Sequence, residues 1–202
     1  MGIPVLILGE SGAGKSASLR NFSPDEVVIY NVAGKPLPFR GAKLNRADNA
    51  DYARIIAGLA KAKFKRYVID DSQYLLCFEL FDRSAEVGYT KFTEMARHFY
   101  DLIQTVIRKT PPDVIVYFLH HTELDGSRIK AKTIGKMLDE KLTLEGLFSI
   151  VLMAKNDDGR HIFITQSDGT NTVKTPMEMF ESTEIDNDLK QVDRTIREYY
   201  SL

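Results

Sequence analysis

The chain has 202 residues, of which 44% are hydrophobic, and its 27 basic and 28 acidic residues leave a formal net charge of −1. This length suits one domain with one hydrophobic core, so we predict a single domain over residues 1–202. The near-neutral charge excludes a global electrostatic field that would attract nucleic acid or a membrane surface, so any contact with a polyanion must be local. The single cysteine, Cys77, excludes an internal disulfide and a cysteine-based zinc site.

Apolar runs in the sequence are short. None approaches the roughly 18 residues that a membrane-spanning helix needs, and the N-terminus leads straight into a predicted strand without the pattern of a secretory signal. We therefore expect a soluble, unexported protein of the cytoplasm that does not bind a membrane.

The strongest local signal lies in residues 4–20, PVLILGESGAGKSASLR, which predict a buried strand, a glycine-rich turn and a helix. The stretch matches the phosphate-binding pattern G-x-x-x-x-G-K-[ST] in the strand-then-helix context that this pattern requires. Its glycines allow successive backbone N–H groups to point at phosphate oxygens, beside the positive end of the helix. Lys15 can reach the β- and γ-phosphates, and Ser16 can offer its hydroxyl to Mg²⁺. The predicted triphosphate-binding residues are Gly9, Glu10, Ser11, Gly12, Ala13, Gly14, Lys15, Ser16 and Ala17.

The next elements follow from local pattern. A helix is expected over residues 14–21 and a β-branched strand over 27–32. Two prolines and two glycines predict a loop over residues 33–41. An apolar stripe at helical spacing then predicts an amphipathic helix over residues 48–63, capped at its first or second residue.

A second chemical signal is the pair of carboxylates that follows the apolar run Tyr67–Ile69. Ligands of open α/β sheets bind at the carboxyl ends of the strands, so Asp70 is placed to hold Mg²⁺ directly or through water. Adjacent residues at a strand end can face the same crevice. Asp71 is therefore a candidate to orient or deprotonate the attacking water.

Two helices are predicted next, over residues 73–86 and 91–109, followed by a central strand over 114–119. This strand ends in His120 and His121. If the strand lies beside the first one, a histidine at its end can sense the γ-phosphate.

Residues 122–136 are polar, carry several cations and have no apolar stripe, which predicts a mobile loop. The rest of the chain predicts a helix over residues 134–144 and a strand over 148–154 that pairs in a hairpin with residues 160–166. A loop is expected over residues 168–176. An amphipathic C-terminal helix is expected in residues 183–202, starting at a capping box of Thr183 and Asp186.

The order of these elements resembles the RecA-like and AAA-like branch of the phosphate-loop (P-loop) NTPases. More narrowly, GESGAGKS, NVAGKPLPFRG, VIDDS and FLHHTE resemble the short phage-encoded ATPases related to RecA that accompany recombination and annealing systems. The resemblance spans roughly residues 3–180, although only the phosphate loop and the Asp-Asp motif are specific. It implies a three-layer α/β P-loop NTPase fold, with a mostly parallel central sheet, helices on both faces and a C-terminal β-hairpin. It also implies Mg²⁺-dependent ATP hydrolysis coupled to single-stranded DNA, in a ring or filament, within the host cytoplasm.

The resemblance also implies roles for single residues. By similarity, Lys15, Ser16 and Asp70 take the nucleotide and the metal, and His120 or His121 acts as the sensor. In RecA-like proteins the loop after the sensor strand faces the DNA. The corresponding cations here are Arg128, Lys130 and Lys132, with the basic stretch from Lys61 to Arg66 as the next candidate.

The sequence departs from this family pattern at two places. RecA-type proteins carry a catalytic glutamate near the end of the second strand, where this chain has Asn31, which cannot act as a base. Either Asp71 substitutes for it or hydrolysis is slow. There is also no arginine finger at a motif position, so Lys174, or a lysine from residues 128–136, would have to supply charge in trans.

Two other functions remain open on the sequence. Small nucleotide-type kinases share the phosphate loop and this chain length, and residues 122–136 could serve as a short lid. Asn31 in the glutamate position also allows a nucleotide-gated scaffold with little turnover. A signalling GTPase is disfavoured because the chain contains no N-K-x-D motif.

Overall fold

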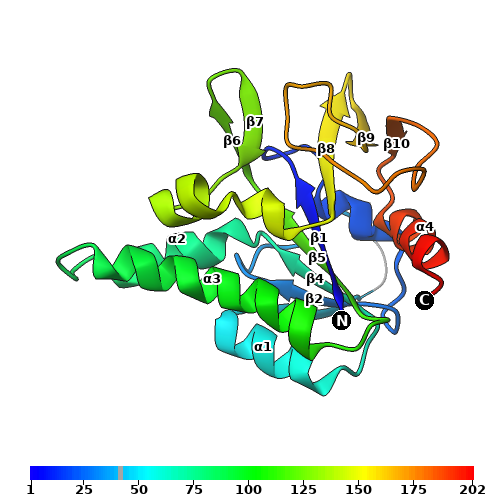
Figure 1. Ribbon diagram of the computed structural model, residues 1–202. Helices are drawn as coiled ribbons and strands as arrows, with labels where there is room; N and C mark the ends of the chain where they lie inside the picture. Colours follow the sequence, from blue (N-terminus) through cyan, green and yellow to red (C-terminus); the bar gives the residue numbers. More distant parts are fainter. Residues whose placement is uncertain (41–42) are drawn as a thin grey trace.

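A computed structural model describes residues 1–40 and 43–202 of the chain (Figure 1). The strands are β1 (Ile3–Leu8), β2 (Val28–Asn31), β3 (Asn45–Asp48), β4 (Arg66–Asp70), β5 (Ile115–His120), β6 (Thr122–Asp125), β7 (Arg128–Ala131), β8 (Ile150–Asp157), β9 (Arg160–Ile164) and β10 (Glu184–Asp186). The α-helices are α1 (Tyr52–Lys61), α2 (Gln73–Asp82), α3 (Thr90–Lys109) and α4 (Leu189–Tyr200). Shorter helical segments are the 3₁₀ helices η1 (Ser16–Asn21) and η3 (Leu144–Leu147) and the π-helical turn η2 (Met137–Leu142).

The described residues form an eight-stranded sheet in the order β10-β9-β8-β1-β5-β4-β2-β3, and a separate β6-β7 hairpin. Strands β8, β1, β5, β4, β2 and β3 run parallel, whereas β9 and β10 are antiparallel additions at one edge. All six residues of β5 are buried, as the continuous apolar run predicts for a central parallel strand. This strand lies beside the first one, which is the condition that the sensor hypothesis required, and β5 separates β1 from β4.

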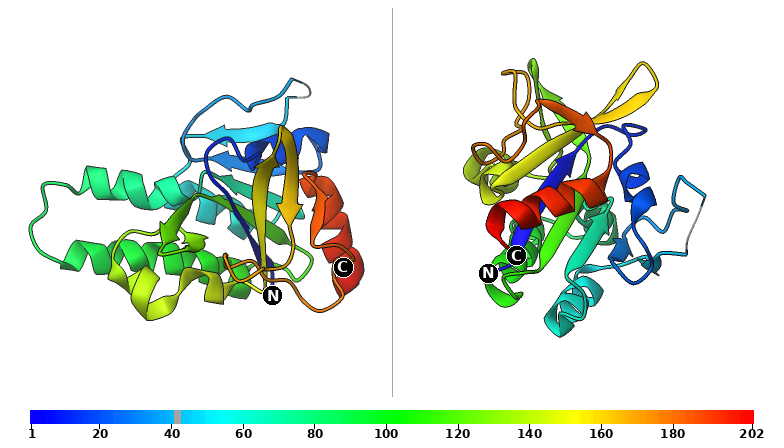
Figure 2. Two further views of the ribbon diagram at one scale, coloured as in Figure 1. Left: turned by 90° about the horizontal axis from the view of Figure 1, so that it is seen from above. Right: turned by 90° about the vertical axis from the view of Figure 1, so that its right-hand side faces the viewer.

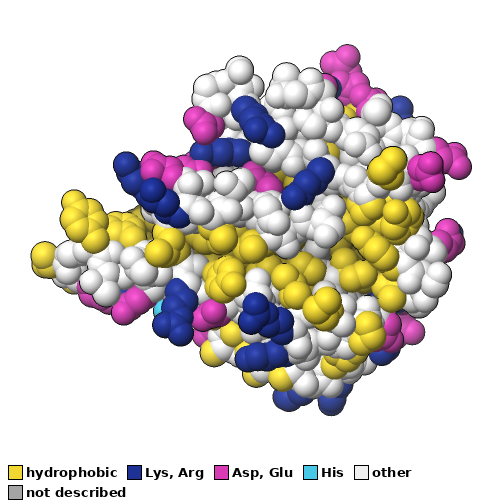
Figure 3. Space-filling model, in the orientation of Figure 1, with side chains coloured by type: hydrophobic (Ala, Val, Ile, Leu, Met, Phe, Trp, Pro, Cys, Tyr) yellow, Lys and Arg dark blue, Asp and Glu magenta, His cyan; other side chains and the backbone are white. Residues whose placement is uncertain are grey.

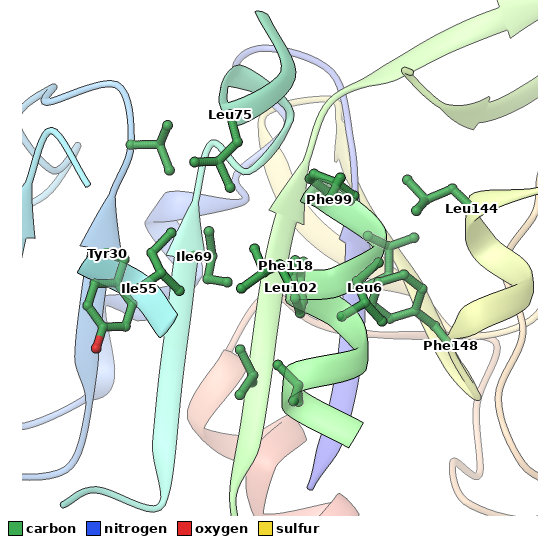
Figure 4. Close-up of a cluster of buried hydrophobic side chains, with 14 of the residues drawn as sticks. Leu6, Tyr30, Ile55, Ile69, Leu75, Phe99, Leu102, Phe118, Leu144 and Phe148 are labelled. Carbon is green, nitrogen blue, oxygen red and sulfur yellow. The ribbon is translucent and has the colours of Figure 1, made fainter. Parts of the chain in front are cut away.

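The sheet is covered on both faces, which gives a three-layer α/β architecture (Figure 2). Successive side chains of a strand point to opposite faces. Leu6 and Leu8 accordingly pack with α1, α2 and α3 (Figure 4), and Val5 and Ile7 pack with η1 and α4. The predicted α/β class, mostly parallel sheet and helices on both faces are therefore confirmed, together with the β8-β9 hairpin.

Some apolar side chains stay on the surface. The connection between α2 and α3 projects from the body of the molecule (Figure 1), and hydrophobic side chains gather at its tip (Figure 3). The exposed side chains here are Phe81, near the end of α2, and Val87 and Tyr89 in the connection. Among the described residues, no helix combines the length and the apolar character that crossing a bilayer requires.

Two boundaries at the N-terminal half differ from the sequence prediction. The expected helix over 48–63 begins only at Tyr52, because the Asp51 carboxylate caps it by accepting a hydrogen bond from Arg54 N at 2.8 Å. Residues 45–48 instead form the edge strand β3, which the sequence did not predict. Within the expected loop over 33–41, residues 33–40 contain no helix or strand, and Gly41 lies outside the described residues.

The segment after β5 also differs from its prediction. Residues 122–131 pair as the β6-β7 hairpin instead of a loop, and the Glu145 carboxylate accepts a hydrogen bond from Ala131 N at 2.8 Å. The helix expected over 134–144 is reduced to η2.

The C-terminal helix starts later than predicted. Residues 184–186 extend the sheet as β10, and α4 is capped by Asp188, whose carboxylate accepts from Lys190 N and Gln191 N. The capping box expected at Thr183 and Asp186 is therefore wrong: pairing with β9 satisfies this backbone in an extended conformation.

A buried carboxylate fastens α4 to the sheet. Asp193 is 1% exposed and accepts hydrogen bonds from Arg66 Nε at 2.5 Å, Tyr117 Oη at 2.9 Å and Arg197 Nε at 2.9 Å. These donors come from β4, β5 and α4 itself, so one side chain connects three elements.

We predict that Asp193→Ala lowers the free energy of unfolding by about 3–5 kcal/mol, because it leaves buried donors without an acceptor. Urea unfolding monitored by circular dichroism measures this change. The control is Asp113→Ala, which removes a partly exposed ion pair with Lys65 and should cost no more than about 1 kcal/mol. Equal losses in the two variants would contradict the role of Asp193.

Candidate functional site

The candidate site lies where the carboxyl ends of β1, β4 and β5 meet. The segment Gly9–Lys15 follows β1, Asp70 ends β4 and His120 ends β5. A cavity of about 290 Å³ opens here. It is lined by Glu10, Ser11, Gly12, Gly14, Lys15, Ser16, Ala17, Lys35, Pro36, Pro38, Asp70, Asp71, His121 and His161.

Most of the predicted phosphate-loop residues therefore share one cavity. Gly9 and Ala13 instead line a larger neighbouring cavity of about 860 Å³, whose wall also includes Glu10, Ser11 and Gly12. Two features require a glycine at position 14. Its φ is +101°, which other residues rarely adopt, and a Cβ atom there would lie 2.9 Å from the ring of His161.

The side chain of Lys15 is folded across the loop. It is only 5% exposed, and its Nζ donates to Gly9 O at 2.7 Å and to Glu10 O at 2.9 Å. Burial lowers the pKa of Lys15 to about 8, although the nearby Asp71 and Asp70 carboxylates act to raise it. The ammonium group thus rests on two carbonyls without a directly bonded anion, and a bound anion could replace these contacts.

The helix after the loop is shorter than predicted. Residues 16–21 form the 3₁₀ helix η1, where an α-helix was expected over 14–21. A helix of this length contributes little macrodipole at its N-terminus, so any attraction of the loop for an anion would come mainly from its N–H groups and Lys15.

Ser16 and Asp70 meet across the intervening strand β5. Ser16 Oγ donates to Asp70 Oδ1 at 2.8 Å, and Asp70 is 5% exposed. Burial raises the pKa of Asp70 to about 6, and the charge of Asp71 adds to this rise. Asp70 makes no ion pair with any described residue. A buried carboxylate and a hydroxyl that lack a cation are a donor set suited to a hard divalent ion such as Mg²⁺.

These oxygens do not form a self-sufficient metal cage. The described residues contain no group of three or more His, Cys, Asp or Glu side chains arranged to hold a metal ion. Mg²⁺ is commonly held by one or two protein oxygens together with phosphate oxygens and water. Ser16 and Asp70 fit that arrangement and do not fit a permanently bound structural metal.

Asp71 is the most constrained residue of the site. Its φ is +59°, an uncommon conformation for a non-glycine residue. Its Oδ1 lies 3.1 Å from His121 Nε2, and its Oδ2 accepts from Lys35 Nζ at 2.8 Å. Although burial raises the pKa of Asp71, the hydrogen bonds from His121 and Lys35 outweigh burial and hold it at about 2. Asp71 is therefore a good hydrogen-bond acceptor and a poor proton acceptor at neutral pH.

Only one of the two predicted histidines reaches the cavity. His121 lines it, whereas His120 is completely buried behind it. The His120 ring nitrogens lie 2.9 Å from Ser72 Oγ and 2.9 Å from Lys132 O, and burial lowers its pKa to about 4. The structure thus gives His120 a structural position, tying β5 to the segments on either side, and not the predicted sensor position.

The cations predicted further along the chain lie outside this cavity. On the β6-β7 hairpin, Lys130 Nζ is 3.1 Å from Asp125 and 2.5 Å from Asp139, so its charge is already balanced. Arg128 Nε lies 3.4 Å from Asn171 O, and Lys132 is exposed. Lys174 is exposed beside Val151 of β8, with which it forms an isolated antiparallel bridge.

The structure adds two residues that the sequence analysis missed. Lys35 enters the cavity from the loop after β2, and His161 enters it from β9. The His161 Nδ1 atom is buried and has no hydrogen-bond partner in the structure. No sequence signal could have found His161, since the run HIFITQ indicates only a strand. Lys35 follows a glycine in a predicted loop, which marks a turn and no particular direction.

Comparison of the chain with protein-family models gave no match, and comparison with curated protein sequences gave none either. The interpretation of the site therefore depends on its geometry and chemistry.

We predict that Asp70→Asn stabilises the protein when nucleotide and divalent metal are both absent. The raised pKa means that the folded state binds the Asp70 proton more tightly than the unfolded state does, so this contribution to stability is lost as pH rises from about 4 through about 6. The difference between about 6 and the ordinary 3.8 corresponds to roughly 3 kcal/mol at pH 8.

Urea unfolding in a chelating buffer at pH 8 and at pH 4 measures this effect. The gain should be present at pH 8 and largely absent at pH 4, where Asp70 is protonated in the folded wild-type protein. A variant that is less stable than the wild type at pH 8 would contradict the raised pKa.

Proposed function

We propose that the chain binds a nucleoside triphosphate together with Mg²⁺ in the Gly9–Ala17 loop and hydrolyses it. The observation that carries this proposal is the hydrogen bond of 2.8 Å between Ser16 and Asp70. These residues are 54 positions apart: Ser16 begins η1, after β1, and Asp70 ends β4, and β5 lies between β1 and β4. A phosphate loop followed by a hydroxyl that meets a buried carboxylate is the arrangement that Mg²⁺-dependent phosphoryl transfer requires.

The loop backbone and three side chains of the cavity have defined roles in this proposal. The loop N–H groups bind the phosphate oxygens, and Lys15 exchanges its contacts with Gly9 O and Glu10 O for the β- and γ-phosphates. Ser16 and Asp70 would hold Mg²⁺, which when bound neutralises charge on the phosphate oxygens. ATP is the expected nucleotide on the basis of the family resemblance.

Hydrolysis forms a bond between the water oxygen and the γ-phosphorus and breaks the bond from that phosphorus to the bridging oxygen, which leaves with ADP. Asp71 and His121 are placed to orient the water by hydrogen bonds. The low pKa of Asp71 makes it a poor general base. The water proton therefore ends on the released phosphate, as a loose transition state with little proton transfer allows.

A second candidate activity is phosphoryl transfer to a small molecule. The cavity of about 860 Å³ shares Glu10, Ser11 and Gly12 with the site and is large enough for an acceptor molecule. Assaying inorganic phosphate release beside phosphorylation of nucleosides and nucleotides separates the two activities. A scaffold that binds nucleotide without turnover would give neither product.

We predict that Lys15→Ala weakens triphosphate binding by about tenfold to a hundredfold, because one or two charge-assisted hydrogen bonds to phosphate are lost. Calorimetric titration with Mg·ATP measures the affinity, and circular dichroism checks the fold. Unchanged binding by a folded variant would reject the phosphate-loop assignment.

We also propose that the β6-β7 hairpin couples the nucleotide site to single-stranded DNA. The hairpin follows β5 directly, and its base is fixed by hydrogen bonds from Lys132 N to His121 O and from His120 Nε2 to Lys132 O. A change at His121 can therefore be passed to the hairpin backbone. Because Asp125 and Asp139 balance Lys130, Arg128 and Lys132 remain as the cations that can contact phosphates.

We predict that the double variant Arg128→Ala/Lys132→Ala lowers DNA affinity and reduces the slope of log affinity against log salt by about 1.4, the value for two phosphate contacts on a single strand. Fluorescence anisotropy with a labelled oligonucleotide and Mg·ATP, at several salt concentrations, measures both. Lys130→Ala is the matched control and should leave the slope unchanged. An unchanged slope in the double variant would exclude the hairpin as the DNA contact.

Assembly into a ring or filament, with Lys174 reaching the site of a neighbour, remains a prediction. Light scattering with and without ATP and DNA tests it.

A further inference from the structure

The loop after β2 is built around Lys35. Asn31, at the end of β2, is 1% exposed, and its Nδ2 donates to Lys35 O at 2.7 Å and to Asp48 Oδ1 at 2.7 Å. The preceding residue, Gly34, has a φ of +66°, and a Cβ atom there would lie 2.3 Å from Asn49 Oδ1. The side chain of Asn31 thus serves to fix the backbone of Lys35 beside the cavity.

The Lys35 side chain reaches from this loop to Asp71, which also lines the cavity. Its Nζ donates to Asp71 Oδ2 at 2.8 Å and lies 5.0 Å from the centroid of the Tyr74 ring. The hydrogen bond to Asp71 raises the pKa of Lys35, so the group stays cationic. Its side chain is 58% exposed, which leaves it free to move toward a ligand.

The charges around the cavity define what Lys35 can do. The cavity is lined by two lysines, Lys15 and Lys35, and by no arginine from the described residues. Lys15 is held against the loop, on the β1 side of Asp70 and Asp71, and Lys35 is held on the opposite side, on Asp71. A polyphosphate lying along the loop would have Lys15 at its inner end, and Lys35 is the second cation available to its terminal phosphate.

We propose that Lys35 is a catalytic cation, supplied by the same chain, that contacts the γ-phosphate of the bound triphosphate. On binding, its Nζ exchanges Asp71 Oδ2 for a γ-phosphate oxygen, and Asp71 remains held by His121 while its freed oxygen accepts a hydrogen bond from the attacking water. This inference rests on the proposed nucleotide site and replaces the cation otherwise expected in trans.

The exchange is energetically modest. The Lys35 end of its ion pair with Asp71 is 58% exposed, so solvent weakens that pair, whereas a hydrogen bond to a γ-phosphate oxygen is charge-assisted. Contact with the γ-phosphate is gained by a triphosphate and not by a diphosphate. Lys35 should therefore discriminate between the two, and Lys15, which also meets the β-phosphate, should contribute to both.

The test compares Lys35→Met, which keeps the apolar stem and removes the charge, with Lys35→Arg. Lys109→Met is the matched control, because Lys109 is exposed at the C-terminal end of α3 and does not line the cavity. Binding of Mg·ADP and of a non-hydrolysable Mg·ATP analogue is measured by calorimetry, and turnover by phosphate release.

For Lys35→Met we expect affinity for the triphosphate analogue to fall about tenfold or more, affinity for Mg·ADP to stay within about twofold, and turnover to fall further than binding. Lys35→Arg should retain most of the discrimination, and Lys109→Met should behave as the wild type. An equal loss for both nucleotides, or no loss for either, would overturn the role of Lys35.

The Lys15→Ala protein separates this inference from the proposed function. If the wild type binds both nucleotides, Lys15→Ala loses both and Lys35→Met loses neither, then the nucleotide site stands and the role of Lys35 is rejected. If the wild type binds neither nucleotide, both proposals are rejected.

Discussion

The insertion of β5 between β1 and β4 is the constraint on which the site depends. Parallel pairing brings Leu8 level with His120 and Ile69 level with Phe118. The loop that follows β1 and the carboxylate of Asp70 at the end of β4 therefore lie at the same edge of the sheet, with only β5 between them. That spacing allows Ser16 Oγ to reach Asp70 Oδ1. A shift by one residue would turn Tyr117 to the other face of the sheet and break its hydrogen bond to Asp193, and this specifies the register.

Two adjacent carboxylates in this crevice are driven to opposite protonation behaviour by their surroundings. Burial without a bonded cation raises the pKa of Asp70, and contacts with Lys35 and His121 lower that of Asp71. Divergent pKa values in neighbouring acids are a common mark of divided roles in catalytic sites. In the proposed nucleotide site they suit Asp70 to the metal position and Asp71 to a purely accepting role, whereas the sequence allowed Asp71 as either water-orienting group or base.

The absence of a glutamate after the second strand has a structural counterpart. Asn31 occupies that position and uses its amide to hold the backbone of Lys35, whose ammonium group donates to Asp71 Oδ2. The 3₁₀ helix η1 is short, so the partial positive charge at its N-terminus is weaker than that of a full α-helix. In the proposed site, neutralising a bound anion would therefore depend more on the side chains of Lys15 and Lys35.

The sequence by itself determined the glycine-rich loop after the first strand, the position of Asp70 and the α/β class, because each depends on local pattern: glycine spacing, an apolar strand ending in a carboxylate, and alternating periodicities. Tertiary structure decided the rest of the site. Whether His120 or His121 faces the cavity depends on the direction of one strand end, and His161 enters because β9 pairs back onto β8. The hairpin over 122–131, the strand β10 and the late start of α4 were decided by backbone pairing and packing between distant segments. Such long-range pairings outweigh local propensity, because a buried backbone group must find its partner wherever the fold supplies one.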